Sequence, residues 1–172
     1  MHHDPANIET ERLWLRAMRA DDVDDLLTIF ADPRVMASFG VGVFDRAQME
    51  RWVQRNLEHQ QRYGYGLFSV IHNADRRLIG DCGLENMEIE GVTETELGYD
   101  FRSDYWNQGL ATEAAASVRD YAFGPLALRR LVSLIRDGNL ASQRVAEKIG
   151  MCQSANIVRN GHAYCVYSLT NA

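Results

Sequence analysis

The sequence predicts a mixed α/β (α+β) fold, with a mostly antiparallel sheet flanked by helices. Strand patterns follow one another in the middle of the chain, strand and helix patterns alternate after it, and Asn160-Gly161 marks a two-residue hairpin turn near the end. Consecutive strands favour antiparallel pairing, whereas a strand–helix–strand crossover favours a parallel pair. No linker or repeat divides the chain, so we expect one domain over residues 1–172.

Alternating apolar residues and helix caps define the elements of the first half. Asp21-Asp22 opens an amphipathic helix, and Pro33 marks its end. Asp45, with Gln48 three residues later, has the pattern of a capping box and begins a second helix. The predicted elements are a strand over 9–19, a helix that starts at 21–22 and ends before 33, a loop over 33–44 and a helix over 45–62.

Glycine and proline separate the elements of the second half. Gly64 and Gly66 introduce strands that should form an antiparallel meander. Gly124-Pro125 stops an alanine-rich helix, and Gly150 caps a later one. The predicted elements are strands over 66–72, 77–90 and 93–101, a helix over 111–123, a strand over 131–136, a helix over 140–149 and two terminal strands.

The composition is that of an ordinary globular protein. The chain has 172 residues, of which 46% are apolar and 24% are charged, so it can bury a core without disulfides or metals. The net charge is −6, whereas a non-specific nucleic-acid binder needs a basic face. We therefore expect no nucleic-acid partner. The scattered histidines have no ligand spacing and predict no metal site.

The cysteines and the N-terminus indicate the cellular compartment in which we expect the protein. Cys82, Cys152 and Cys165 are odd in number and far apart, so we expect reduced core thiols in a cytoplasmic protein. The stretch Met1–Pro5 contains no apolar run and predicts no signal peptide. No segment approaches the ~20 apolar residues that span a bilayer, so we expect no membrane partner.

The stretch from Trp106 to Thr112 is the most informative part of the chain, because a small-residue loop there leads into a helix. Gly109 permits close approach of a ligand to the backbone. The first amides of a helix have no intrahelical acceptor, and the helix dipole favours an anion beside them. The amides expected to point at one spot are those of Gln108, Gly109, Leu110, Ala111 and Thr112. This pattern predicts a phosphate or pyrophosphate cradle, and the alternative is an ordinary structural helix start.

Four short motifs occur in order along the chain. They are E-T-E-R-L-x-L-R at 9–16, E-L-G-Y-x-x-R-x-x-Y-W-N-Q-G-L-A-T-E-A at 96–114, N-x-x-S-x-x-x-A-x-K-x-G-M at 139–151, and a segment at 160–169 that begins N-G and ends Y-S-L. Together they resemble the GNAT N-acetyltransferase superfamily, and within it the Rim-type branch of ribosomal-protein N-terminal acetyltransferases. The second motif resembles the coenzyme A pyrophosphate loop, with Gly109 and Ala111 at its last two positions and Trp106 where Gln or Arg is more general.

The resemblance implies the GNAT fold, a mixed sheet that splays between the strands at 93–101 and 131–136. Acetyl-CoA, the implied cosubstrate, would lie in that gap, with pantetheine pairing near Tyr99 and Phe101 and the pyrophosphate on the loop amides. Asn139 resembles the residue that bonds the pantetheine arm, and it also fits a plain N-cap. An amine would attack the thioester directly from the opposite side.

The resemblance also implies two catalytic groups. Glu96 lies where many family members place a general base that removes a proton from the amine, and the alternative is a solvated strand carboxylate. Ser142 corresponds to a position close to the coenzyme sulfur, where a hydroxyl stabilises the departing thiolate. Its alternative is a serine that satisfies backbone amides in the first helical turn. Many members use a tyrosine a few residues further on, which this chain lacks at 145–148.

The acceptor remains open between a protein N-terminus and a small amine. The loop at 33–44 matches the variable acceptor-pocket segment, in which Phe39 and Phe44 either line the pocket or fill the core, and the capping pattern favours core for Phe44. The alternative function is a non-catalytic acyl-CoA-binding or regulatory protein on the same fold, and a nucleotide-binding module is a third reading. The resemblance also suggests a homodimer.

Overall fold

The computed structural model describes residues 7–172 and contains one eight-stranded sheet in the order β1-β2-β3-β4-β5-β6-β8-β7. Neighbouring strands are antiparallel except β5 and β6, which are parallel. This arrangement confirms the predicted mixed, mostly antiparallel sheet. The strands are β1 (Ile8–Glu9), β2 (Leu13–Ala17), β3 (Leu67–His72), β4 (Leu78–Ile89), β5 (Val92–Phe101), β6 (Arg130–Arg136), β7 (Cys152–Arg159) and β8 (His162–Thr170). Residues 1–6, on which the prediction of no signal peptide falls, lie outside the described range.

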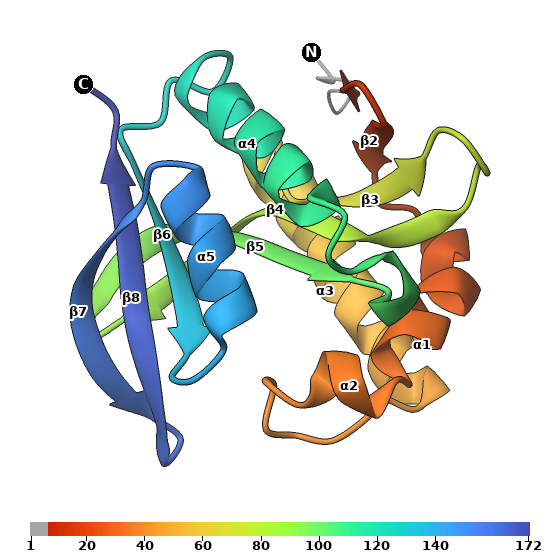
Figure 1. The fold of residues 1–172 in the computed structure, drawn as a ribbon, viewed down its shortest axis with the longest axis horizontal. Helices are drawn as coiled ribbons and strands as arrows, with labels where there is room; N and C mark the ends of the chain where they lie inside the picture. Colours follow the sequence, from red (N-terminus) through yellow and green to blue (C-terminus); the bar gives the residue numbers. More distant parts are fainter. Residues whose placement is uncertain (1–6) are drawn as a thin grey trace.

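Helices cover both faces of the sheet, with α4 and α5 on one face and α3 on the other (Figure 1). A core that includes Leu13, Phe68 and Leu97 packs beneath α4, and a second core that includes Phe30 and Met49 packs between α1, α3 and the sheet. Within the described residues, no helix is both long and apolar enough to cross a bilayer. The helices are α1 (Val23–Phe30), α2 (Pro33–Met36), α3 (Arg46–Tyr63), α4 (Leu110–Phe123) and α5 (Leu140–Lys148), with 3-10 turns at Ala20–Asp22 and Ser103–Tyr105.

The capping box and the hairpin turn that the sequence predicts both form. The Asp45 carboxylate accepts a hydrogen bond from the amide of Gln48 at 2.8 Å, and the Gln48 side chain accepts one from the amide of Asp45 at 2.8 Å. Asn160 and Gly161 have φ values of 51° and 76° between β7 and β8. These left-handed values match the hairpin turn that the dipeptide predicts.

Two expectations need correction. Pro33 does not lie in a loop, because it occupies the first turn of α2, where its missing N–H costs nothing. Asp32 caps that helix by accepting a hydrogen bond from the amide of Arg34 at 2.9 Å. Cys152 is not a core thiol, since it is exposed at the start of β7, whereas Cys82 and Cys165 are buried.

The parallel strands β5 and β6 separate almost as soon as they meet. Their register contains the single pair Glu96–Val132. Side chains then replace the backbone ladder. The Glu96 carboxylate accepts a hydrogen bond from the amide of Leu134 at 3.1 Å, and the Ser133 hydroxyl donates to the carbonyl oxygen of Leu97 at 2.6 Å. The predicted splay between these two strands is therefore confirmed.

The close approach of β3 to β4 predicts different effects of an alanine substitution at two facing glycines, Gly83 on β4 and Gly98 on β5. A Cβ at Gly83 would lie 2.3 Å from the carbonyl oxygen of Gly66, a backbone atom that cannot move freely, whereas a Cβ at Gly98 would meet nothing within 4 Å. We expect Gly83→Ala to lower the free energy of unfolding by about 1–3 kcal/mol, as overpacking does. Gly98→Ala should change it by less than about 1 kcal/mol. Equal urea midpoints for the two variants would contradict this prediction.

Candidate active site

A cleft of about 670 Å³ lies beside the separated ends of β5 and β6. Its walls come from α2, the end of β5, the first turn of α4, the loop after β6 and one side of α5. The N-terminal ends of both α4 and α5 therefore face one space. Such an arrangement favours a ligand that carries negative charge.

The start of α4 provides free amides at this cleft. Its N-cap is Gly109, which has a φ of 76° and no side chain to cap the helix. The amide of Glu113 makes the first intrahelical bond, to the Gly109 carbonyl oxygen at 3.0 Å. The preceding amides of the turn lack an intrahelical acceptor. The residues of this turn that line the cleft are Gly109, Leu110, Ala111 and Thr112. This geometry fits a phosphate group.

Gln108 takes a different position from the four residues that follow it. It is not among the residues that line the cleft, and its carbonyl oxygen accepts a hydrogen bond from Nη1 of Arg12 at 2.8 Å. That contact holds the carbonyl on the side of β2. The role of Gln108 in ligand binding stays a prediction.

A cluster of hydrogen bonds ties the first turn of α4 to the start of β2. The Glu113 carboxylate accepts hydrogen bonds from the Thr10 hydroxyl at 2.6 Å, the Arg12 amide at 2.8 Å and Nε of Arg12 at 2.7 Å. Burial alone would raise the pKa of Glu113, but these bonds outweigh it and hold the pKa below its ordinary value. Thr10, Arg12 and Glu113 all lie within the sequence motifs, yet nothing in their spacing indicates that they contact one another.

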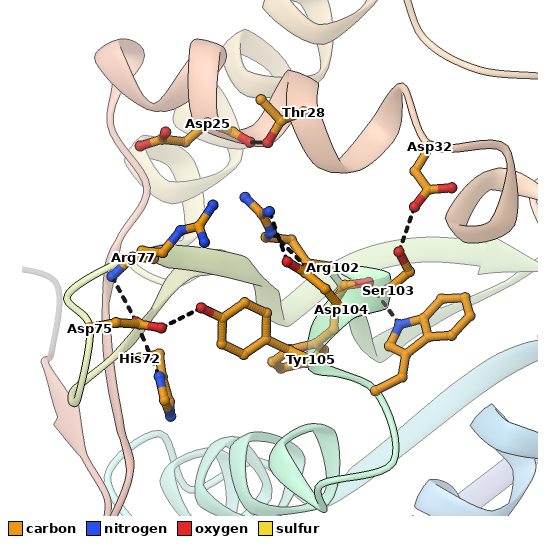
Figure 2. A network of polar contacts seen from close by, with 12 residues as sticks. Asp25, Thr28, Asp32, His72, Asp75, Arg77, Arg102, Ser103, Asp104 and Tyr105 are labelled. Atoms are coloured by element: carbon orange, nitrogen blue, oxygen red, sulfur yellow. Dashed lines mark hydrogen bonds and ion pairs between the residues drawn. The ribbon is translucent and has the colours of Figure 1, made fainter.

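Hydrogen bonds to neighbouring elements hold the connection from β5 to α4, and Figure 2 shows those of Ser103 and Tyr105. The Ser103 hydroxyl donates to the carboxylate of Asp32 at 2.6 Å, which joins this connection to the N-cap of α2. The Tyr105 hydroxyl donates to Asp75 in the turn between β3 and β4. Trp106 donates its indole N–H to the carbonyl oxygen of Phe101 at 2.9 Å. The loop that carries Gly109 is therefore fixed before any ligand binds.

Tyr99, Phe101 and Asn139, which are predicted binding residues, and Ser142, a predicted catalytic residue, all line the cleft. The Tyr99 hydroxyl donates to the carbonyl oxygen of Ser142 at 2.7 Å, which bridges β5 and α5 across the split. Burial raises the pKa of Tyr99, so the hydroxyl stays protonated. Asn139 is the N-cap of α5, since its side chain accepts from the Ser142 amide at 3.3 Å. Its contact with a pantetheine arm stays a prediction.

Glu96 lies where β5 and β6 meet rather than among the residues that line the cleft. Burial raises its pKa to about 7, against the lowering effect of the hydrogen bond from Leu134, and negative charge from Glu85 and Asp100 adds to the rise. A carboxyl group with this pKa exists in both forms at neutral pH. That property suits a general base.

Asp100 is a cleft residue that the sequence reasoning missed. It lies on the same face of β5 as Glu96, two residues beyond Gly98, and it lines the cleft. Burial raises its pKa to about 6. Asp81 lies directly opposite on β4, with 1% of its surface exposed. Burial, with the neighbouring charge of Asp100, raises the pKa of Asp81 well above its ordinary value. Strand alternation places Asp100 with Glu96, but only the register of β4 brings in Asp81.

Four cationic side chains also line the cleft, and two of them lie on α5. They are Arg34, Arg136, Arg144 and Lys148. Arg34 is already paired with Asp32 at 2.9 Å, and Nη2 of Arg136 lies 2.7 Å from Nδ1 of His162. The two cations on α5 carry the positive charge that a polyphosphate ligand needs.

Comparison with known proteins identifies this architecture. The family model for the acetyltransferase (GNAT) domain matches residues 12–152. The chain belongs to the GNAT acetyltransferase family and is an acetyltransferase. Members of this family use acetyl-CoA as the acetyl donor, and the free amides of α4 with the cations of α5 fit its phosphate groups.

Individual relatives agree with this assignment. The chain is 36% identical over 159 residues to the uncharacterized protein YkkB of Bacillus subtilis (strain 168), with 92% of each chain covered. An acetyltransferase from Agrobacterium tumefaciens str. C58 is 28% identical with a TM-score of 0.83, over 96% of this chain and 95% of that one. RimL, a ribosomal L7/L12 α-N-protein acetyltransferase solved in complex with coenzyme A, shares the fold at 21% identity and a TM-score of 0.79, over 96% and 98% of the two chains.

The environment of Glu96 predicts opposite effects of one substitution on stability and on activity. A folded pKa of about 7 against an ordinary 4.5 means that the folded state binds more protons between these values. Wild-type stability should therefore fall as pH rises through that window. Glu96→Gln keeps an acceptor for the Leu134 amide but carries no charge. It should be more stable than wild type at pH 8, while thiol release falls roughly a hundredfold.

Thermal melting at pH 5 and pH 8, together with an assay of free thiol release, checks this expectation. A stability difference between the two proteins that is the same at both pH values would show that Glu96 does not titrate in this window. An unchanged rate of thiol release would remove Glu96 from the chemistry.

Proposed function

We propose that the protein is an acetyl-CoA-dependent N-acetyltransferase that transfers the acetyl group to a primary amine, either a protein N-terminus or a small amine, by direct attack on the thioester. The observation that carries this proposal is the uncapped N-terminus of α4, which opens into the cleft where β5 and β6 separate. Membership of the acetyltransferase family supports the class of reaction.

The donor side of the proposal uses the free backbone of this region. The amides from Gly109 to Thr112 would hold the pyrophosphate, and Arg144 and Lys148 lie on the same cleft to meet further phosphate charge. Beyond Glu96, the edge of β5 toward β6 has no strand partner. An extended pantetheine arm would add to this edge beside Tyr99 in the manner of a further strand.

The chemical step then needs two groups. Glu96 would take a proton from the attacking amine, through water, since it lies at the closed end of the split rather than on the cleft wall. Ser142 would donate its hydroxyl to the departing thiolate. Tyr99 is a weaker candidate for that donor, because its hydroxyl proton already goes to the carbonyl oxygen of Ser142.

One observation favours a second candidate function. Glu96 is engaged by the Leu134 amide and does not line the cleft, which also fits a protein that binds an acyl-CoA without turning it over. Calorimetry with acetyl-CoA, followed by a thiol-release assay with a panel of amines and N-terminal peptides, separates the two. Release with one acceptor class supports the transferase. Binding without any release supports the non-catalytic protein, and no binding contradicts both.

The positive φ of Gly109 and its position on the cleft predict that Gly109→Arg abolishes acetyl-CoA binding, because the new side chain fills the cradle. Gly161→Arg is a matched control, since Gly161 has the same φ of 76° and a Cβ there meets nothing within 4 Å. Both variants carry the same backbone strain, yet only the first should lose binding in calorimetry. Unchanged affinity in Gly109→Arg would show that the phosphates do not bind there.

The position of Ser142 on the cleft wall predicts a selective kinetic defect. Ser142→Ala keeps the backbone amide that Asn139 caps and the carbonyl that Tyr99 contacts, so the fold should persist. We expect kcat to fall by roughly tenfold to a hundredfold, which is the cost of one lost hydrogen bond to a developing charge, while the Kd for acetyl-CoA changes by less than about threefold. Steady-state kinetics with calorimetry checks this, and an unchanged kcat excludes Ser142 from the reaction.

A further inference from the structure

One face of β4 and β5 carries a set of facing carboxylates. Asp81 lies opposite Asp100, and Glu85 lies opposite Glu96. The two glutamates have partners, because Glu85 pairs with Arg55 at 3.2 Å and Glu96 accepts the Leu134 amide. Within residues 7–172, neither aspartate has an ion-pair partner. Because the pKa of Asp81 is raised the more strongly, Asp81 is the protonated member, and Asp100 holds the negative charge of the pair without a cation.

Among the described residues, two buried polar atoms at this pair lack a hydrogen bond of good geometry. They are Oδ2 of Asp81 and the neighbouring indole Nε1 of Trp52, and the Trp52 N–H lowers the pKa of Asp81. Asp81, with 1% of its surface exposed, is the deeper of the two aspartates. Buried carboxyl groups without a full set of partners are uncommon, and they point to a ligand at the outer member, Asp100, which lines the cleft.

The space beside the pair suits a small cation. Gly98 lies between Glu96 and Asp100 on the same face, and a Cβ there would meet nothing within 4 Å. Trp52 packs against three phenylalanine rings with centroid distances of 5.3, 5.9 and 6.2 Å. These rings belong to the core between α1, α3 and the sheet, so the carboxylates are the groups that would attract an ammonium ion here.

We infer that the Asp81–Asp100 pair binds a second ammonium group of the acceptor, so that the acceptor is a small amine with two positive charges. This inference rests on the proposed function and specifies its substrate class. The reacting amine has to lie near Glu96 and Gly98, where the strands split. Asp100 lies two residues from Gly98 and four from Glu96, which is roughly 7 to 13 Å along an extended strand.

The charges around the pair agree with this assignment. Two adjacent carboxylates without a cation repel each other when both ionise. Burial and the charge of Asp100 raise the pKa of Asp81, whereas burial alone raises that of Asp100. An ammonium group would relieve that repulsion. Arg34, the cation of α2 on the same cleft, is held by Asp32 and does not compete for the pair.

The test compares α,ω-diaminoalkanes of three to eight carbons with n-alkylamines of the same length at saturating acetyl-CoA, by thiol release. In wild type, the best diamine should have a KM at least about tenfold below that of its matched monoamine, which is the effect of one charged contact. Asp100→Asn should raise the diamine KM by about tenfold or more relative to the monoamine KM, so that the preference for the diamine disappears. Glu88→Gln, an equal charge loss at an exposed position of β4, should change neither.

Further measurements distinguish a failure of this inference from a loss of folding and from a failure of the proposed function. Acetyl-CoA affinity should match wild type in Asp100→Asn, and the melting temperature at pH 8 should be no lower than that of wild type, because the variant loses a buried charge with a raised pKa. Asp100→Glu should recover part of the diamine preference, and Asp81→Asn provides a second variant of the pair. Equal KM values for diamine and monoamine in wild type, or equal losses for both in Asp100→Asn, overturn the inference. Release with peptides but not with diamines overturns it and leaves the proposed function intact, whereas no release with any acceptor overturns both.

Discussion

The structure depends on the insertion of the Glu96 side chain between two parallel strands. After the single pair Glu96–Val132, the carboxylate takes the Leu134 amide that a backbone ladder would have used. The strands cannot close beyond this point, and the unpaired edge of β5 becomes one wall of the cleft. The cost is a buried carboxyl group with a raised pKa. The feature that opens the cleft is therefore also a position of electrostatic strain.

Rigid support surrounds this opening on the donor side. Helices α4 and α5 both direct their N-terminal ends into the cleft. The loop between β5 and α4 is held by hydrogen bonds to Asp32 and Asp75 (Figure 2) and to the carbonyl oxygen of Phe101. The face of β4 and β5 that carries Asp81, Asp100, Glu85 and Glu96 differs in character, because carboxylates dominate it. The asymmetry matches a reaction between an anionic donor and a cationic acceptor.

Sequence reasoning succeeded where the determinants are local. The capping box at Asp45, the turn at Asn160-Gly161 and the uncapped helix at Gly109 all depend on residues within a few positions of each other. It failed where the determinant is register. No spacing in the sequence pairs Asp81 with Asp100, since that contact exists only once β4 and β5 align. Pro33 was misjudged for another reason, because a proline tolerated in a first helical turn also resembles a stop.

The bonds between Glu113 and the start of β2 link parts of the chain that lie more than a hundred residues apart, at separations of 103 residues for Thr10 and 101 for Arg12. The first turn of α4, which we propose binds phosphate, therefore reaches its final geometry only after the first strand has docked, late in synthesis and folding. A donor that needs this turn binds only the completed molecule. By mass action, the cell's supply of the donor then shifts the population toward fully assembled chains and away from partly folded ones.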